Sequence, residues 1–209
     1  NSAFSQIDWP TGTTWYYRMR PFFSQDIFPN KHVITGDTII QGKSCKIMQR
    51  DHTTDDIRPE TEFLFVKNDS ISFYDADSET FKLLYDFTME VGDTAYFPLW
   101  KYMPFNNFNN TDDFIYSVVV DSVDTIDIGG MPRKRMYISA TMQGNQPITE
   151  SKSSTLIYGI GSTTNFFIWD ENGLSDDRSN SGLRCFEVDG DLLFEDYPDE
   201  DCDEVIMPS

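Results

Sequence analysis

The chain has 209 residues, a formal net charge of −19 and an aromatic content of 15%. This length permits one large all-β domain or two small ones, and the aromatic content excludes a disordered chain. With 16 basic residues against 35 acidic ones, the sequence offers no basic face for a nucleic acid or an anionic membrane. No apolar stretch approaches the roughly 20 residues of a transmembrane helix. The chain starts at Asn1 without an initiator Met, so we expect a mature or trimmed form.

Short alternating segments separated by turn residues follow one another along the whole chain. In order, the predicted strands span residues 13–20, 32–40, 43–50, 62–67, 71–74, 81–87, 94–99, 114–128, 133–141, 155–158, 165–169, 183–188 and 191–195. The last two are joined by Asp189-Gly190, a strong type I′ hairpin signal. No long amphipathic helix is expected. We therefore predict an all-β, mostly antiparallel barrel or sandwich built from sequential hairpins, with the strand order left open.

Two predicted hairpins share one pattern. Residues 34–48 and 123–137 both contain Asp-Thr-Ile, a Gly turn and a basic strand that leads to Met. The similarity suggests a pseudo-repeat, with its break near residues 105–112. Common turn chemistry explains the same pattern without any duplication. We favour a single β domain over residues 1–209.

The three cysteines divide into a candidate pair and a single residue. Cys185 and Cys202 flank an acidic hairpin near the end of the chain. A bridge between them would stabilise the fold by about 3 kcal/mol in the loop-entropy model, and it is expected if the chain is exported. Cys45 lies within a predicted strand, and we expect it to be a small buried side chain rather than a reactive thiol.

Histidine-based chemistry has little support in this sequence. The two histidines, His32 and His52, are expected as surface imidazoles, and no Cys/His spacing matches a zinc site. The same scarcity weakens Ser-His-Asp and Cys-His catalysis. Carboxylates are abundant enough for a glycosidase mechanism, but most of them lie in turns, where a solvated surface explains them.

Calcium is the metal that the sequence fits best. Asp75, Asp77 and Glu79 place alternate carboxylates on one turn, and oxygen ligands on such a loop suit a hard cation. A second candidate loop spans residues 170–177. The turn at residues 75–79 lacks the Gly and the distal Glu spacing of an EF-hand loop, and an acidic hairpin tip that discourages edge aggregation is the competing interpretation.

A long segment between predicted strands is the best candidate for ligand binding. Residues 98–113 contain Trp100, Tyr102, Phe105 and Phe108 among four asparagines. Exposed aromatic rings beside amide groups can stack on sugar rings or anchor a protein interface. The alternative is that these rings fold back as a lid on an open barrel end.

Several short motifs resemble a poorly characterised, β-rich region of secreted Bacteroidetes proteins, of the type found upstream of type IX secretion sorting domains. The motifs are Gly36-Asp37-Thr38, Leu84-Tyr85-Asp86-Phe87, Val91-Gly92-Asp93-Thr94, Tyr158-Gly159-Ile160-Gly161-Ser162 and Leu183-Arg184-Cys185-Phe186. The resemblance spans about residues 10 to 205. It implies export to the cell surface or the medium, and it supplies no catalytic residues.

A second resemblance concerns glycan attachment. Bacteroidetes attach O-glycans at Asp-Ser or Asp-Thr followed by an aliphatic or similar residue, and the chain has matching sites at Ser70, Thr38, Thr94, Ser122 and Thr125. Hairpins generate the same string by themselves, because Asp favours turns and Thr favours strands.

Taken together, these patterns predict a non-catalytic secreted or cell-surface module that binds a glycan or a protein. No cofactor is expected other than the candidate calcium ion, and no nucleic acid is expected as a partner. A carboxylate-dependent polysaccharide hydrolase is the first alternative. The second is a structural scaffold of a larger surface protein. The ligand and the oligomeric state are left open by the sequence.

Overall fold

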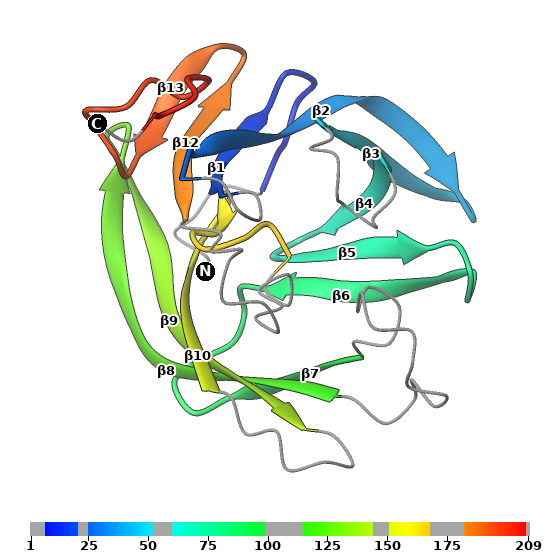
Figure 1. Ribbon diagram of the computed structural model, residues 1–209. Helices are drawn as coiled ribbons and strands as arrows, with labels where there is room; N and C mark the ends of the chain where they lie inside the picture. The colour runs from blue at the N-terminus through cyan, green and yellow to red at the C-terminus, as the bar shows by residue number, and fades with distance from the viewer. Residues whose placement is uncertain are drawn as a thin grey trace.

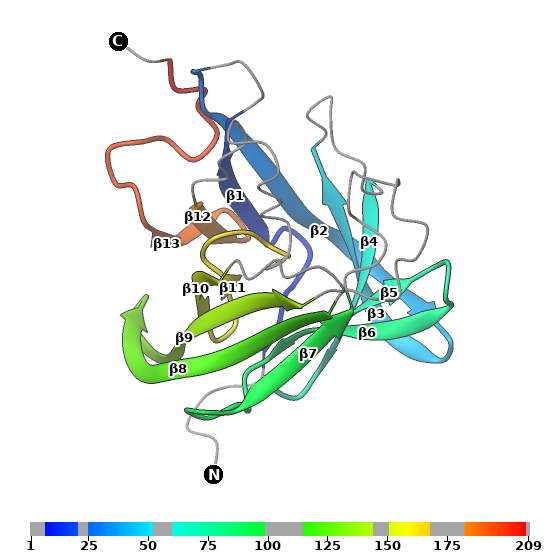
Figure 2. The same cartoon turned by 60° about the horizontal axis from the view of Figure 1, so that its bottom comes forward.

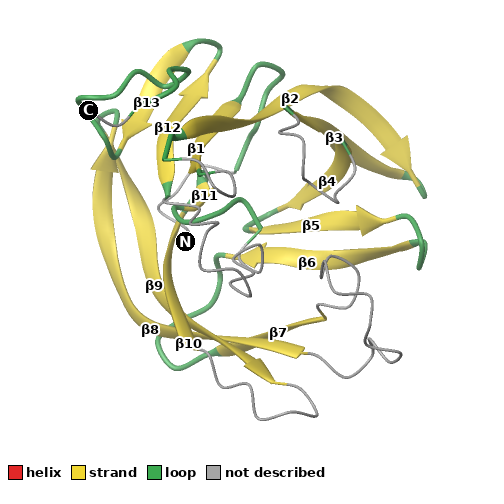
Figure 3. Ribbon diagram, viewed as in Figure 1, coloured by secondary structure: helices red, strands yellow, loops and turns green. Residues whose placement is uncertain are grey.

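The computed structural model describes residues 7–20, 25–51, 60–98, 115–143, 151–167 and 182–207. The described residues form thirteen strands and no helix, as Figure 3 shows. The strands are β1 (Thr14–Met19), β2 (Phe28–Ile40), β3 (Lys43–Arg50), β4 (Thr61–Lys67), β5 (Ser70–Asp75), β6 (Thr80–Asp86), β7 (Thr94–Pro98), β8 (Ile115–Ile128), β9 (Met131–Gln143), β10 (Ser151–Ile157), β11 (Gly161–Ser162), β12 (Leu183–Val188) and β13 (Asp191–Glu195). All pairings between strands are antiparallel, which confirms the predicted all-β class.

The strands form two sheets. The larger sheet has eight strands in the order β13-β12-β1-β2-β3-β4-β5-β6, and the smaller has five in the order β11-β10-β9-β8-β7. In Figure 1 the larger sheet curls through the upper and right parts of the molecule, while β8, β9 and β10 close the left and lower parts. Figure 2 shows β7, β8 and β9 along one side of the molecule and β1 and β2 on the other.

The strand order within the sheets places distant parts of the sequence side by side. β12 and β13 extend the larger sheet by pairing with β1, so the last strands lie beside the first one. β7 and β8, which flank the region of the expected repeat boundary, pair with each other from Thr94↔Val119 to Pro98↔Ile115. One cluster of buried apolar residues includes side chains from both sheets. The two sheets therefore share a core.

Period-2 alternation explains which side chains enter that core. In the smaller sheet Val118, Val120, Ile138 and Leu156 are buried, and the residues between them along each strand are less buried or polar. Successive side chains of a strand point to opposite faces of a sheet, so one face of each strand packs inward. At about 25 cal/mol per Å² of apolar surface removed from water, this burial is the main stabilising contribution.

The predicted strand over residues 165–169 is wrong for its described part. Residues 165–167 are irregular, although Phe166 and Phe167 are fully buried. The main-chain carbonyl of Phe166 accepts a hydrogen bond from the hydroxyl of Tyr85. The aromatic residues that suggested a strand instead fill the interior between the sheets.

Aromatic donors from β1 hold the β10–β11 turn from inside. Trp15 Nε1 donates to the carbonyl of Ile160 at 2.7 Å, and Tyr17 Oη donates to that of Ser162 at 2.7 Å. Trp9, just before the strand, donates in the same way to Gly159 at 2.8 Å. Because buried main-chain carbonyls need donors, these three bonds fix how the larger sheet meets the smaller one.

The two hairpins with the shared sequence pattern also share one contact. Lys46 Nζ lies 2.9 Å from Asp37 Oδ1 across β2–β3, and Arg135 Nη2 lies 2.6 Å from Asp124 Oδ2 across β8–β9. In both hairpins the Asp of Asp-Thr-Ile thus faces a cation on the partner strand. Cross-strand pairing of this kind contributes roughly 0.2–1 kcal/mol at an exposed site.

Candidate ligand-binding face

The outer face of the five-stranded sheet carries an array of hydroxyl-bearing side chains. The strand register aligns these outward positions into rows that cross the sheet. One row is Ser153–Ser139–Val119–Thr94, the next is Thr141–Ser117–Tyr96, and the third is Thr155–Tyr137–Ser122. We call these ten residues the hydroxyl face. Nine of them carry a hydroxyl group and Val119 does not, and Ser117 is buried, with its hydroxyl donating to the Thr141 carbonyl at 3.3 Å. Neighbouring strands are about 4.8 Å apart and successive rows about 7 Å apart, so the face measures roughly 14 Å in each direction.

None of the ten residues of the hydroxyl face carries a charge, whereas the chain as a whole has a net charge of −19. Its two aromatic side chains reach solvent, with Tyr96 63% exposed and Tyr137 36% exposed. The neighbouring residue Ala95 packs against the core. Because successive side chains of a strand point to opposite faces, the side chain of Tyr96 points outward. Exposed rings among uncharged hydroxyl groups are suited to a neutral polar ligand.

Two carboxylates border the residues of the hydroxyl face. In the middle row, Asp121 Oδ2 accepts a hydrogen bond from the Ser139 hydroxyl at 2.6 Å, and Asp124 lies at one end of the face. Arg135 donates two hydrogen bonds to the Asp124 carboxylate, from Nε at 2.7 Å and from Nη2 at 2.6 Å. Tyr137 Oη donates to the same carboxylate at 3.4 Å, and the Arg135 guanidinium lies 5.1 Å from the tyrosine ring centre. The hydrogen bonds from Arg135 lower the pKa of the exposed Asp124 carboxyl group. These contacts restrict the rotamer of Tyr137 and so preorganise one ring of the face.

The four predicted ligand-binding aromatics, Trp100, Tyr102, Phe105 and Phe108, lie outside the described residues. The strands on either side of them are described, since β7 ends at Pro98 and β8 begins at Ile115. The pair Tyr96↔Ser117 is one row from these strand ends, at a distance of about 7 Å. The hydroxyl face therefore reaches the end of the sheet from which that segment departs.

The predicted calcium turn is described, and its first carboxylate has partners from the chain itself. Asp75 Oδ2 accepts hydrogen bonds from the Ser78 hydroxyl at 2.6 Å and lies 2.7 Å from Lys82 Nζ. Asp77 and Glu79 are exposed, and the Glu79 carbonyl accepts a hydrogen bond from Gln41 Nε2 at 2.7 Å. In the part of the chain that the structure describes, no group of three His, Cys, Asp or Glu side chains is placed to hold a metal ion. The residues 170–177 of the second candidate loop are not described.

A row of ionisable side chains crosses the inner face of the larger sheet. It consists of His32, Arg50, Glu62, Asp75 and Lys82, one from each of the strands β2 to β6. The first four are buried, and the Lys82 side chain is 15% exposed. The prediction of a surface His32 is therefore wrong. Its ring stacks on Phe166 at 13° with 5.3 Å between ring centres, since it has the inward parity of its buried neighbour Ile34.

This inner row was missed in the sequence, although strand parity could have identified it. Arg50, Glu62 and Asp75 each lie two residues from an apolar core residue of the same strand, namely Met48, Leu64 and Phe73. Burial by itself would raise the pKa of Asp75, but hydrogen bonds from Lys82, Ser78 and a main-chain N–H outweigh it. The net result is a pKa well below the ordinary value. Such a carboxylate is suited to a permanent ion pair and not to donating a proton.

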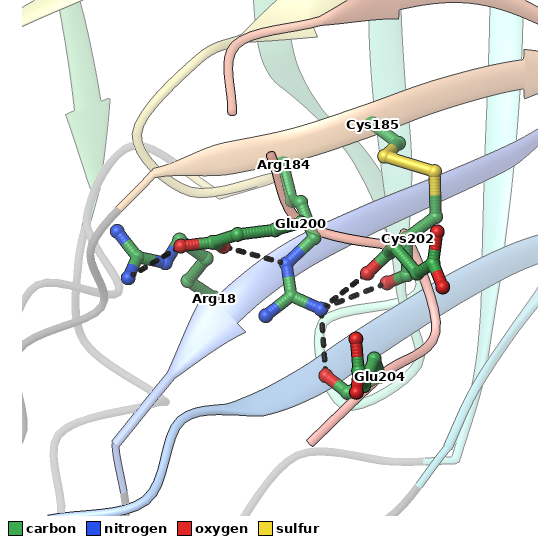
Figure 4. Close-up of polar contacts among 7 residues, drawn as sticks. Arg18, Arg184, Cys185, Glu200, Cys202 and Glu204 are labelled. Carbon is green, nitrogen blue, oxygen red and sulfur yellow. Dashed lines mark hydrogen bonds and ion pairs between the residues drawn. A yellow bond between two sulfur atoms is a disulfide. The ribbon is translucent and has the colours of Figure 1, made fainter. Parts of the chain in front are cut away.

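The disulfide predicted between Cys185 and Cys202 is present, with 5.6 Å between the two Cα atoms. Beside it, Arg184 is fully buried, and its Nη1 donates to the main-chain carbonyls of Asp201 at 2.8 Å and Glu204 at 2.7 Å. Figure 4 shows Glu200 between two guanidinium groups, 3.2 Å from Arg184 Nε and 3.2 Å from Arg18 Nη2.

Cys45 is buried, as expected, and burial raises the pKa of its thiol. None of the described segments includes a helix that is long and apolar enough to span a membrane. No protein-family model, curated protein or solved structure matches this chain.

Proposed function

We propose that the chain is a non-catalytic, exported binding module that holds a neutral glycan on the hydroxyl face. The observation that carries this proposal is the array of neutral hydroxyl and tyrosine side chains, bordered by the carboxylates of Asp121 and Asp124, on a strongly acidic protein. Sugar rings present C–H faces that stack on aromatic rings, and hydroxyl groups that exchange hydrogen bonds with Ser, Thr and Tyr. The dimensions of the face suit a short oligosaccharide better than a single sugar.

Export is part of the same proposal. The Cys185–Cys202 disulfide supports it, because structural disulfides persist in oxidising compartments and are rare in the cytosol. Two of the carboxylates, Asp75 and Asp124, are unsuited to the general-acid role that hydrolysis needs. A general acid needs a raised pKa, whereas the pKa values of Asp75 and Asp124 are both lowered by their basic partners.

The test is a glycan array probed with the wild-type protein and with Tyr96→Ala. Losing an exposed ring that stacks on a sugar should weaken binding about five- to tenfold, at an energy of roughly 1–1.5 kcal/mol. Ile39→Ala is the matched control, because Ile39 is also strongly exposed but lies on β2 in the other sheet. Binding that survives Tyr96→Ala unchanged would refute the assigned face. No binding to any neutral glycan would refute the ligand class and leave a protein partner or a scaffold role.

A further inference from the structure

The last described residues form a strap over the outside of the larger sheet. Residues 196–207, which we call the C-terminal strap, follow β13 and return to the start of β2, where Ile206 and Ile27 exchange two main-chain hydrogen bonds of 2.9 Å. Below the strap lie Arg184 and Cys185 of β12, both fully buried. β12 and β1, near one edge of the larger sheet, are thus covered on both faces, by the core inside and by the strap outside.

Apolar burial contributes little to holding the strap in place. Every residue of the strap is exposed or half-buried, including Val205 and Met207, which are exposed. The strap contains six acidic residues and no basic one, and the remainder of the chain is also strongly acidic. Like charges therefore favour release of the strap, and the hydrophobic effect opposes that release only weakly.

Besides the two main-chain hydrogen bonds between Ile206 and Ile27, three side-chain contacts oppose the release. The first is the disulfide to Cys185. The second is the Arg184 guanidinium, which donates hydrogen bonds to main-chain carbonyls of the strap and has the Glu200 carboxylate on its other side (Figure 4). We call these carbonyls the carbonyl cage. The third is Arg18, which is 3.2 Å from Glu200 and 4.2 Å from the ring centre of Tyr197. Only the disulfide is covalent, and the sulfur of Cys202 belongs to a half-buried residue.

We propose that the strap is a redox-gated latch, docked while the Cys185–Cys202 disulfide is intact and released when a dithiol reduces it, with both sheets remaining folded. A thiolate of the dithiol attacks the Cys202 sulfur and forms a mixed disulfide, while Cys185 leaves as a thiolate and takes up a proton. The second thiol of the reductant then closes its own disulfide and frees Cys202 as a thiol. The release uncovers Arg18, Arg184 and Tyr16, a cationic and aromatic surface on an acidic protein.

The latch gives the two redox states different surfaces. In a reducing compartment the strap is free and the surface with its two guanidinium groups is open. In an oxidising compartment the disulfide closes a loop with a sequence separation of 17 and the strap covers that surface. The loop-closure contribution corresponds to a change on the order of 100-fold in the equilibrium between docked and free strap.

Hydrogen–deuterium exchange measured with and without a dithiol tests the latch. The background variant is Cys45→Ala, which leaves Cys185 and Cys202 as the remaining cysteines. We expect exchange at the Ile206 amide to accelerate on the order of 100-fold on reduction, while amides of β3, β4, β8 and β9 keep their rates. The double variant Cys185→Ala/Cys202→Ala should show the fast rate without any reductant.

Two results would overturn the proposal. If the strap amides remain protected in the double variant, the noncovalent contacts suffice and the disulfide gates nothing. If amides of β12, β1 and β3 lose protection together with the strap, the disulfide holds the whole fold together and is no latch. The assay involves no ligand, so its outcome is independent of the proposed glycan binding.

Discussion

Replacing Lys82 by Met should expose how strongly the buried ion pair with Asp75 stabilises the fold. The Asp75 side chain is 2% exposed, and its Oδ2 lies 2.7 Å from Lys82 Nζ. Met keeps much of the length and apolar volume of Lys but removes the charge, so the main effect is that the buried Asp75 carboxylate loses the ammonium group of Lys82. Breaking one partner of a buried pair costs about 3–5 kcal/mol.

The lower end of that range is the better estimate here. Asp75 retains hydrogen bonds from the Ser78 hydroxyl and from the main-chain N–H of Asp77. We therefore expect a loss of about 3 kcal/mol at pH 7, which corresponds to a fall in Tm of about 6–12 °C for a chain of this size. Urea denaturation followed by tryptophan fluorescence measures the free energy, and calorimetry measures Tm.

The dependence on pH gives the sharper test. The pKa of Asp75 is lowered in the folded wild type, so its stabilising contribution is complete above the unfolded value of about 3.9 and declines as the pH falls below it. In Lys82→Met the pKa of Asp75 rises. Protonation of its carboxyl group at low pH then removes the cost of burying the negative charge. The difference in the free energy of unfolding between wild type and variant should therefore shrink as the pH falls from 5 to 3. A deficit that stays constant over this range, or one below about 1 kcal/mol at pH 7, would refute the reasoning.

Four further substitutions test other parts of the structure. Trp15→Phe removes a buried hydrogen bond to the β10–β11 turn and should cost about 2–3 kcal/mol in urea denaturation, whereas an effect below about 0.5 kcal/mol would contradict the role of that bond. Gly161→Ala should destabilise the fold by at least about 2 kcal/mol, because Gly161 has φ +105° and an added Cβ would lie 2.8 Å from the Tyr85 ring. Gly42→Ala, at φ +75° with open space around it, should cost clearly less, and equal losses would contradict the steric explanation. Arg184→Met should accelerate amide exchange in the strap of the oxidised protein while β8 and β9 stay protected, and an unchanged strap would show that the carbonyl cage contributes nothing.

The local hairpins were readable from the sequence because consecutive strands pair across short turns. Gln41-Gly42 and Asp189-Gly190 have positive φ at both residues, as the turn chemistry requires. The long-range order was not readable. The pairing of β12 with β1 depends on which faces are buried together, and turn residues carry no information about that.

The candidate site was only partly accessible to the same reasoning. Polar residues such as Ser139 and Thr141 alternate with buried Ile138 and Ala140, so an outward hydroxyl stripe on β9 follows from parity alone. The stripe becomes a face only when the register places β8 and β10 beside it. The inner ionisable row was hidden for the opposite reason, since charged residues in a strand are ordinarily assigned to solvent. Asp75 is buried because Lys82, on the neighbouring strand, neutralises it.

The measurement that tests the central claim most directly is an amide NMR titration of the protein with a neutral oligosaccharide that scores on the array. We expect the largest changes in amide chemical shift on the hydroxyl face, around Tyr96, Ser117 and Thr141. The chemical shifts of amides in β3 and β4 should not change. Shift changes confined to β12, β1 and the strap, or spread evenly over both sheets, would contradict the assignment of the binding site to the outer face of the smaller sheet.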